Sequence, residues 1–87
     1  MTTNSPKGWV HESGALVREF RFVDFTAAFV FMTRVAEVCE ELDHHPDWSN
    51  SWNVVRVSLT THSMGSIVTD KDVEIASRMN AIFDASR

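Results

Sequence analysis

The sequence of 87 residues lacks several features that mark secreted and membrane proteins. Its one cysteine, Cys39, excludes an internal disulfide and agrees with a reducing compartment. No apolar run approaches the ~18 residues of a membrane span, and Met1 to Ser5 lacks the charged-then-apolar layout of a signal peptide. We therefore expect a soluble, cytoplasmic protein with no membrane partner.

Basic residues are also few. Eight Lys and Arg stand against twelve Asp and Glu, which gives a formal net charge of −4 and a sequence pI near 5.4. Nucleic-acid binding draws its affinity from clustered Lys and Arg, and here these residues are scattered along the chain. We therefore expect no direct contact with nucleic acid.

Apolar residues are abundant for a chain of this length: 44% are hydrophobic, including six Phe and three Trp. A chain of this size buries about 60–65% of the surface that its extended form exposes, which supports one modest core. We expect a single domain over residues 1–87, with a loose N-terminal lead-in at residues 1–8. The surplus of apolar residues indicates either a dense core or a surface kept for a partner subunit.

The periodicity predicts two helices and several strands. Trp9 to Val23 is typical of a β-hairpin with its turn at Ser13-Gly14, because alternate residues are apolar and glycine supports a turn. A helix is predicted from Asp24 or Thr26 to Leu42, where apolar residues recur at three-and-four spacing. These residues are Phe25, Ala28, Phe29, Met32, Val35, Ala36, Cys39 and Leu42.

Further apolar residues on the same helix, Val30, Phe31 and Val38, widen its apolar surface beyond one stripe. A single stripe suffices to cover a sheet. The pattern therefore predicts either that a second face of the helix meets another subunit, or that the helix is buried on two sides within its own domain.

In the second half, Trp52 to His62 alternates as a strand does, with Val55, Val57, Leu59 and Thr61 on the side expected to face the core. The opposite side carries Trp52, Thr60 and His62, and could face a ligand. Residues 63–68 are expected to form a loop or a short returning strand. Thr69 and Asp72 form a capping-box pattern that opens a final helix. This order predicts an α+β fold in which helices cover one face of an antiparallel sheet.

Candidate catalytic residues cluster around two adjacent histidines, His44 and His45, which Pro46 follows. Glu40 lies one helical turn before His44, and His62 lies at the end of the predicted strand. Neutral imidazole accepts a proton at one nitrogen and donates through the other, so several such groups can remove one proton and deliver another. The aromatic surfaces of Trp48 and Trp52 could stack on a heterocyclic ligand.

Three other interpretations remain open from the residues alone. The His44-His45-Pro46 segment could simply end the helix, because histidines are favourable near the negative end of the helix dipole. His44, His45 and His62 with Glu40 could gather around zinc, although adjacent histidines diverge unless the backbone bends. Nucleophilic catalysis is disfavoured, because Cys39 lies within the apolar helical pattern and no serine lies in a nucleophile-elbow setting.

The whole set of residues resembles the signature of the pterin-4a-carbinolamine dehydratases, which are also known as dimerisation cofactors of a homeodomain transcription factor. The resemblance covers nearly the whole chain. It is carried by Gly8-Trp9, Phe20-x-Phe22-x-x-Phe25, Phe29-x-Phe31-Met32-Thr33-Arg34-Val35-Ala36, Glu40-x-Leu42-Asp43-His44-His45-Pro46-Asp47-Trp48, Trp52, Leu59-Thr60-Thr61-His62 and Asp72.

The resemblance implies an α+β domain with an antiparallel four-stranded sheet and helices packed on one face, assembled as a homodimer or homotetramer through helices. It implies loss of water from 4a-hydroxytetrahydrobiopterin to give quinonoid dihydropterin, in the recycling of tetrahydrobiopterin. No metal or organic cofactor is implied. A second class of function, a binding or assembly module that uses the helix surface around Phe31, Arg34 and Val38, would not require the histidines.

Carried over by position, the resemblance implies a role for each site residue. His44 and His62 form the acid–base pair, and His45 chiefly holds the pterin ring. Glu40 orients that group, and Asp72 supports a histidine while it caps its helix. The remaining residues expected near the substrate are Asp43, Trp48, Thr60, Thr61, Ser63 and, by a weaker match, Trp9.

Two departures from the family pattern affect the edge of the expected pocket. Ser63 follows His62 where an acidic residue is common. The loop from Ser63 to Thr69 is about one residue longer than usual. All the motif histidines are retained.

Overall fold

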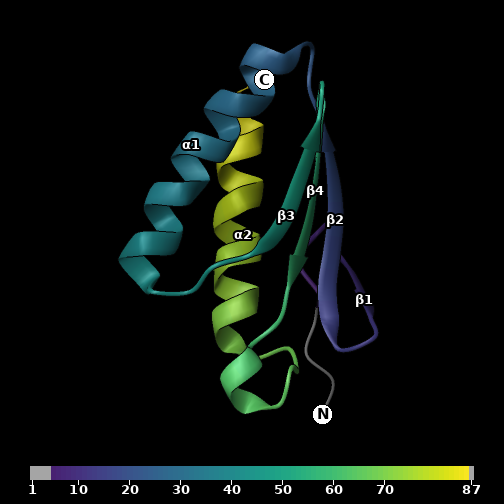
Figure 1. The fold of residues 1–87 in the computed structure, drawn as a ribbon, viewed down its shortest axis with the longest axis vertical. Coiled ribbons are helices and arrows are strands. Elements are labelled where there is room, and N and C mark those ends of the chain that lie inside the picture. The colour runs from purple at the N-terminus through teal and green to yellow at the C-terminus, as the bar shows by residue number, and fades with distance from the viewer. Residues whose placement is uncertain (1–4, 87) are drawn as a thin grey trace.

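The computed structural model describes residues 5–86 and has two layers, an antiparallel sheet and a pair of helices that cover one of its faces (Figure 1). This confirms the predicted α+β fold with four strands. The elements in chain order are β1 (Val10–Glu12), β2 (Ala15–Arg21), α1 (Phe25–Leu42), β3 (Asp47–Ser51), β4 (Val54–Leu59), the 3-10 helix η1 (His62–Met64) and α2 (Asp70–Ala85). No helix among residues 5–86 is long and apolar enough to cross a membrane.

The sheet has the strand order β1-β2-β4-β3, and every neighbouring pair is antiparallel. The predicted hairpin is confirmed: Ser13 and Gly14 form its turn with positive φ values of 51° and 79°. Leu16 and Phe20 of β2 are buried, and Leu16 pairs with Leu59 of β4. The inner face of the sheet is therefore apolar, as the alternation predicts.

Helix α1 begins after Asp24, whose carboxylate accepts a hydrogen bond from the Ala27 N–H at 2.8 Å. The buried residues of α1 are Ala28, Phe31, Val35 and Cys39. The expected faces of α1 were wrong in part. Phe25 and Phe29 of the main apolar pattern are exposed, whereas Phe31, expected on the surface that meets a partner, is buried against Phe20 and Phe22. The exposed apolar face of α1 consists of Phe25, Phe29 and Val30.

One strand of the sheet, β3, was not predicted by the alternation and precedes the strand expected from Trp52 to His62. Residues 47–51 form β3, and Trp52-Asn53 form the turn into β4, which begins at Val54. The Asn50 amide donates to the Trp52 and Val54 carbonyls at 3.1 and 2.9 Å and so stabilises this turn. Residues 63–68 form no returning strand; they contain part of η1 and one isolated bridge between Thr61 and Ile67.

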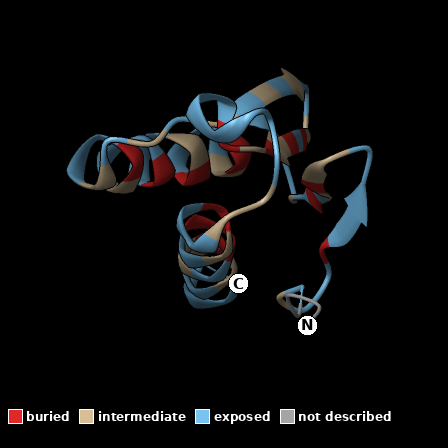
Figure 2. Ribbon diagram, turned by 90° about the horizontal axis from the view of Figure 1, so that it is seen from below, coloured by how far each residue is buried: buried red, intermediate tan, exposed pale blue. Residues whose placement is uncertain are grey.

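Helix α2 begins as its capping-box pattern predicts. The Thr69 N–H donates to the Asp72 carboxylate at 2.9 Å. The face of α2 that meets the sheet and α1 carries Ile75, Ala76, Met79 and Phe83. Figure 2 shows buried segments on both helices and on the strands, whereas β1 is exposed. The core thus lies between the helices and β2 and β4.

The N-terminal lead-in is tied to the rest of the domain at its described end; residues 1–4 lie outside the described residues. The Lys7 carbonyl accepts hydrogen bonds from Arg18 at 3.2 Å and from Asn80 at 2.9 Å. Arg18 also lies over the Phe20 ring, 4.3 Å from its centroid. This network joins residue 7 to β2 and α2.

We expect Gly8→Ala to lower the free energy of unfolding by about 2 kcal/mol. Gly8 has a φ of +87°, and an added Cβ would lie 2.8 Å from the Arg18 guanidinium carbon. Urea unfolding would measure the change. Gly65→Ala is the matched control, because Gly65 has a φ of +85° but an added Cβ meets no atom within 4 Å. Equal losses in the two variants would contradict a role for the Arg18 contact.

Candidate active site

His44, His45 and His62 line one hollow of about 380 Å³. His44 and His45 follow the exit of α1, and His62 belongs to η1. Figure 1 shows η1 and the start of α2 at the lower end of the domain, and His44 contacts Asp72 in the first turn of α2. The other lining residues are Asp43, Thr60, Thr61, Ser63 and Lys71. The hollow is within the volume range of small-molecule sites.

A left-handed residue directs the two adjacent histidines to different partners. Asp43 ends α1 with a φ of 53°, and the following His44 N–H donates to the Cys39 carbonyl at 3.0 Å. After this bend the His44 side chain contacts Asp72 of α2, and the His45 side chain returns to Glu40 of α1. Both imidazoles therefore border the same hollow while their hydrogen bonds diverge.

His44 is bound to a buried carboxylate. Its Nε2 lies 2.6 Å from Asp72 Oδ1, and the Asp72 side chain has no exposed surface. The other oxygen, Oδ2, accepts hydrogen bonds from the Thr61 hydroxyl at 2.7 Å and from the Thr69 N–H at 2.9 Å. An ionised carboxylate has no proton to donate, so with Asp72 ionised we assign the donor of this bond to His44 Nε2, which leaves a lone pair on Nδ1 that can take a proton.

The other two histidines have exposed carboxylate partners. His45 Nε2 lies 2.7 Å from Glu40 Oε2, with 56% and 78% of the two side chains exposed. His62 Nε2 lies 3.6 Å from Asp47 Oδ2, and its Nδ1 lies 3.3 Å from the Ser66 hydroxyl. Each of the three histidines thus has its own carboxylate, and only that of His44 is buried.

The hydroxyl groups of the two threonines that line the hollow, Thr60 and Thr61, form hydrogen bonds with different segments of the chain. The Thr60 hydroxyl donates to the Gly14 carbonyl in the β1–β2 turn at 2.8 Å. The Thr61 hydroxyl donates to Asp72, and it accepts from the Thr69 hydroxyl at 2.6 Å. The end of β4 is therefore held against both the hairpin and α2.

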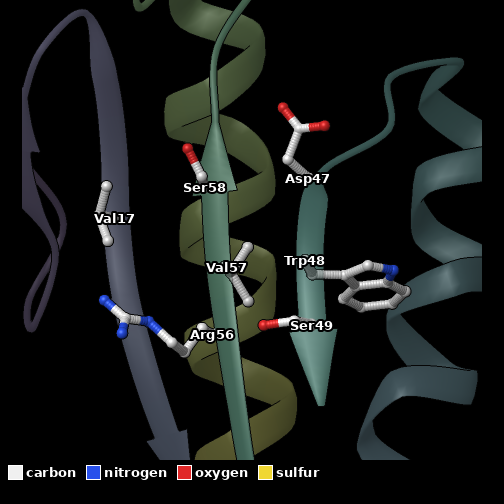
Figure 3. A pocket seen from close by; sticks show the side chains of 7 residues that line it. All are labelled: Val17, Asp47, Trp48, Ser49, Arg56, Val57 and Ser58. Atoms are coloured by element: carbon white, nitrogen blue, oxygen red, sulfur yellow. The ribbon is translucent and has the colours of Figure 1, made fainter.

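Several residues expected near the substrate lie elsewhere. Trp48 packs partly buried against the core, and its indole points toward α1 (Figure 3). Trp52 lies in the turn before β4, at the opposite end of that strand from Thr60 and His62. Trp9 lies in the core against Phe20, with its Nε1–H donating to Asn80 at 2.9 Å. None of the three lines the hollow that contains the histidines.

The single cysteine of the chain, Cys39, does not favour nucleophilic chemistry. Cys39 is 2% exposed, and burial, with a further contribution from the negative charge of Glu40, raises the pKa of its thiol. Among residues 5–86, no three His, Cys, Asp or Glu side chains are arranged to hold a metal ion.

A second hollow, of about 320 Å³, lies on the face of the sheet that the helices leave uncovered (Figure 3). No histidine lines it. Its lining residues are Val17, Asp47, Trp48, Ser49, Arg56, Val57 and Ser58. Asp47 therefore borders this hollow and lies close to His62 as well.

Sequence reasoning missed two residues at or beside the histidine hollow, Asp47 and Lys71. Asp47 follows Pro46 directly, and its closeness to His62 depends on β3, which the pattern did not reveal. Lys71 lies one residue before Asp72 and borders the hollow from the first turn of α2. Its position next to the predicted capping residue was the only available signal.

Three comparisons relate this chain to known proteins. Residues 1–82 match the family model described as pterin 4 alpha carbinolamine dehydratase. A protein of Rhodopseudomonas palustris (strain HaA2) is 52% identical over 77 residues, which cover 86% of this chain and 75% of that protein. A protein of Prochlorococcus marinus (strain MIT 9312) is 48% identical over 77 residues, which cover 88% and 79%. Both are provisionally named pterin-4-alpha-carbinolamine dehydratase.

Two solved structures share the fold. One, described as a transcriptional coactivator/pterin dehydratase from Brucella melitensis, has a TM-score of 0.84 and 46% identity and covers 87% of this chain and 82% of that one. The other is a pterin dehydratase-like protein described as a RuBisCO assembly factor in the alpha-carboxysome. Its TM-score is 0.70 at 20% identity, over 86% of each chain, and this likeness shows the fold alone.

Proposed function

This chain belongs to the pterin 4 alpha carbinolamine dehydratase family, and we propose that it removes water from 4a-hydroxytetrahydropterins, such as 4a-hydroxytetrahydrobiopterin, to give the quinonoid dihydropterin. This reaction would be one step in recycling the pterin used by aromatic amino-acid hydroxylases, and a separate reductase would have to reduce its product. The observation that supports the proposal is the hollow lined by three histidines, each with a carboxylate partner.

The reaction needs one acid and one base. The bond between C4a and its hydroxyl oxygen breaks while that oxygen takes a proton, and N5 loses its proton as the C4a–N5 double bond forms. The products are water and quinonoid dihydropterin, so the two proton transfers balance. Each well-placed transfer by a side chain contributes ~10²–10⁴ to the rate.

The hydrogen bonds support a division of roles between the histidines. His44 is suited to be the base, because Asp72 fixes its Nε2–H and would stabilise the imidazolium formed when Nδ1 takes a proton. His62 is suited to be the acid, because Asp47 lies close enough to pair with its protonated form. His45, held by Glu40, remains to bind the pterin ring.

A spectroscopic assay of carbinolamine dehydration with the purified chain tests this proposal. We expect the chain to accelerate formation of the quinonoid product well above the uncatalysed rate in the same buffer. Catalysis that disappears on heat denaturation, and that scales with protein concentration, would support it. A product rate equal to that of the buffer alone would overturn it and would favour an assembly role.

We also propose that two copies of the chain associate through α1. Phe25, Phe29 and Val30 leave about half of their surface exposed and border an apolar hollow of about 390 Å³. The other lining residues are Thr26, Thr33 and Arg34, so the hollow contains no acidic side chain. A two-fold contact would place the apolar face of one α1 on that of its partner.

We expect Phe29→Glu to lower the mass of the assembly in sedimentation velocity by at least half, because the charge would be buried at the contact. Phe29 is 54% exposed, so the fold of each subunit should persist. Val10→Glu is the matched control, since Val10 is 58% exposed on β1. A single-chain mass for the wild type, or loss of the assembly in the control alone, would contradict the α1 contact.

A further inference from the structure

We propose that Lys71, in the first turn of α2, binds a hydroxylated side chain carried by the pterin ring. This inference rests on the proposed function and concerns which pterins the site prefers. It assigns a role to Lys71, which the catalytic scheme does not use. The ligand class is a pterin with an uncharged alkyl substituent that carries hydroxyl groups.

The first observation is that the histidine hollow continues into another. The neighbouring hollow, of about 320 Å³, is lined by Thr61, Ser63, Met64, Thr69, Asp70 and Lys71. Thr61, Ser63 and Lys71 belong to both hollows. A fused ring held between the histidines would therefore extend its substituent past Lys71 into this second space.

The second observation is that Lys71 is available to a ligand. Among residues 5–86, no carboxylate lies within ion-pair distance of its ammonium group; the nearby Glu74 pairs instead with Arg78 at 3.5 Å. An ammonium group has three donors and accepts from none. It can therefore donate to a substituent oxygen without breaking a bond within the protein.

The charges around this hollow favour an uncharged substituent. Asp70 lines the same space as Lys71, and its carboxylate has no hydrogen bond or ion pair with the described residues. The pair offers a donor and an acceptor to neighbouring hydroxyl groups, whereas a phosphate or carboxylate substituent would meet the negative charge of Asp70. The chain's net charge of −4 acts in the same direction.

A third hollow beside Lys71 fits less well. It is lined by Leu42, Asp70, Lys71 and Glu74, and it shares only Lys71 with the histidine hollow. A substituent directed there would lie between two acidic side chains. Glu74 therefore distinguishes the two directions, because it lines this hollow and not the one beside Met64.

The test compares two substrates that share the ring, 4a-hydroxytetrahydropterins with a dihydroxypropyl or a methyl group at the same carbon. The readout is the ratio of their kcat/KM values, so a loss common to both substrates cancels. We expect Lys71→Met to lower the preference for the dihydroxypropyl substrate about fivefold to tenfold, the size of one hydrogen bond. Lys71→Arg keeps a donor and should restore most of the preference.

Glu74→Gln is the matched control and should leave the ratio unchanged. An unchanged ratio in Lys71→Met, or an equal change in Glu74→Gln, would overturn this inference while the dehydratase activity stands. Failure of the wild type to turn over either substrate would instead overturn the proposed function, and this inference with it.

Discussion

We expect His62→Ala and His44→Ala each to lower the turnover of 4a-hydroxytetrahydropterin by about 100-fold or more. Each substitution removes one of the two groups that would transfer a proton in the elimination. His62 is exposed and contributes little to the fold, so His62→Ala should unfold at the same urea concentration as the wild type. His44→Ala should also fold, with a lower stability because Asp72 loses a partner.

The matched control is His11→Ala. His11 is exposed on β1, outside the hollow, and this variant should retain wild-type turnover. Initial rates under saturating substrate give the turnover of all three variants. Wild-type turnover by both His44→Ala and His62→Ala would contradict the assignment of the acid–base pair.

The second large effect is expected at Asp72. Asp72→Ala should lower the free energy of unfolding by about 3 kcal/mol or more, because the substitution leaves the Thr61 hydroxyl and the Thr69 N–H without their acceptor inside the protein. Losses of this size are a large part of the stability of a small domain. Urea unfolding followed by circular dichroism measures the change.

Asp72→Asn separates the catalytic role of this residue from its role in stability. Its amide can keep one acceptor for Thr61 and Thr69, but its NH₂ group then faces His44 and requires a lone pair at Nε2. The proton of His44 would move to Nδ1, so turnover should fall about 100-fold with a smaller loss of stability.

Asp70→Asn is the matched control for stability. Asp70 lies in the same turn of α2 and is exposed, so its replacement should change the free energy of unfolding by less than about 0.5 kcal/mol. If Asp72→Asn were as stable as Asp70→Asn and also kept wild-type turnover, the role of the buried carboxylate would be contradicted.

The sequence predicts the regular elements well where one pattern dominates. The hairpin, α1, α2 and its cap follow from alternation, three-and-four spacing and the Thr69–Asp72 pair. No such pattern predicts the strand β3. Its sequence, Asp-Trp-Ser-Asn-Ser, has no β-branched residue, and the strand forms by pairing with β4. The positive φ of Trp52, which permits the turn between them, also has no signal in the sequence.

The faces of α1 show a second limit. Phe29 and Phe31 both fit a helical apolar pattern, so periodicity alone does not decide which is buried. The structure decides it through the aromatic cluster of Phe20, Phe22 and Phe83, against which Phe31 packs. Contacts between distant segments therefore determine which face is the core.

For the candidate site, the histidine motif identifies the residues, and the backbone determines their partners. Spacing places Glu40 one turn before His44, yet its carboxylate binds His45, because Asp43 adopts a left-handed conformation. The pairing of His44 with Asp72 joins residues 28 positions apart. Such a pair depends on the packing of α1 against α2, which a local pattern does not contain.

The decisive measurement is a crystal structure of the chain with a 7,8-dihydropterin, which has no C4a hydroxyl group to lose. We predict that the fused ring lies in the hollow between His44, His45 and His62, with N5 within about 3.2 Å of the His44 imidazole or one water away from it. A ring bound in the hollow on the uncovered face of the sheet, with the histidines out of reach, would contradict the proposed dehydratase site.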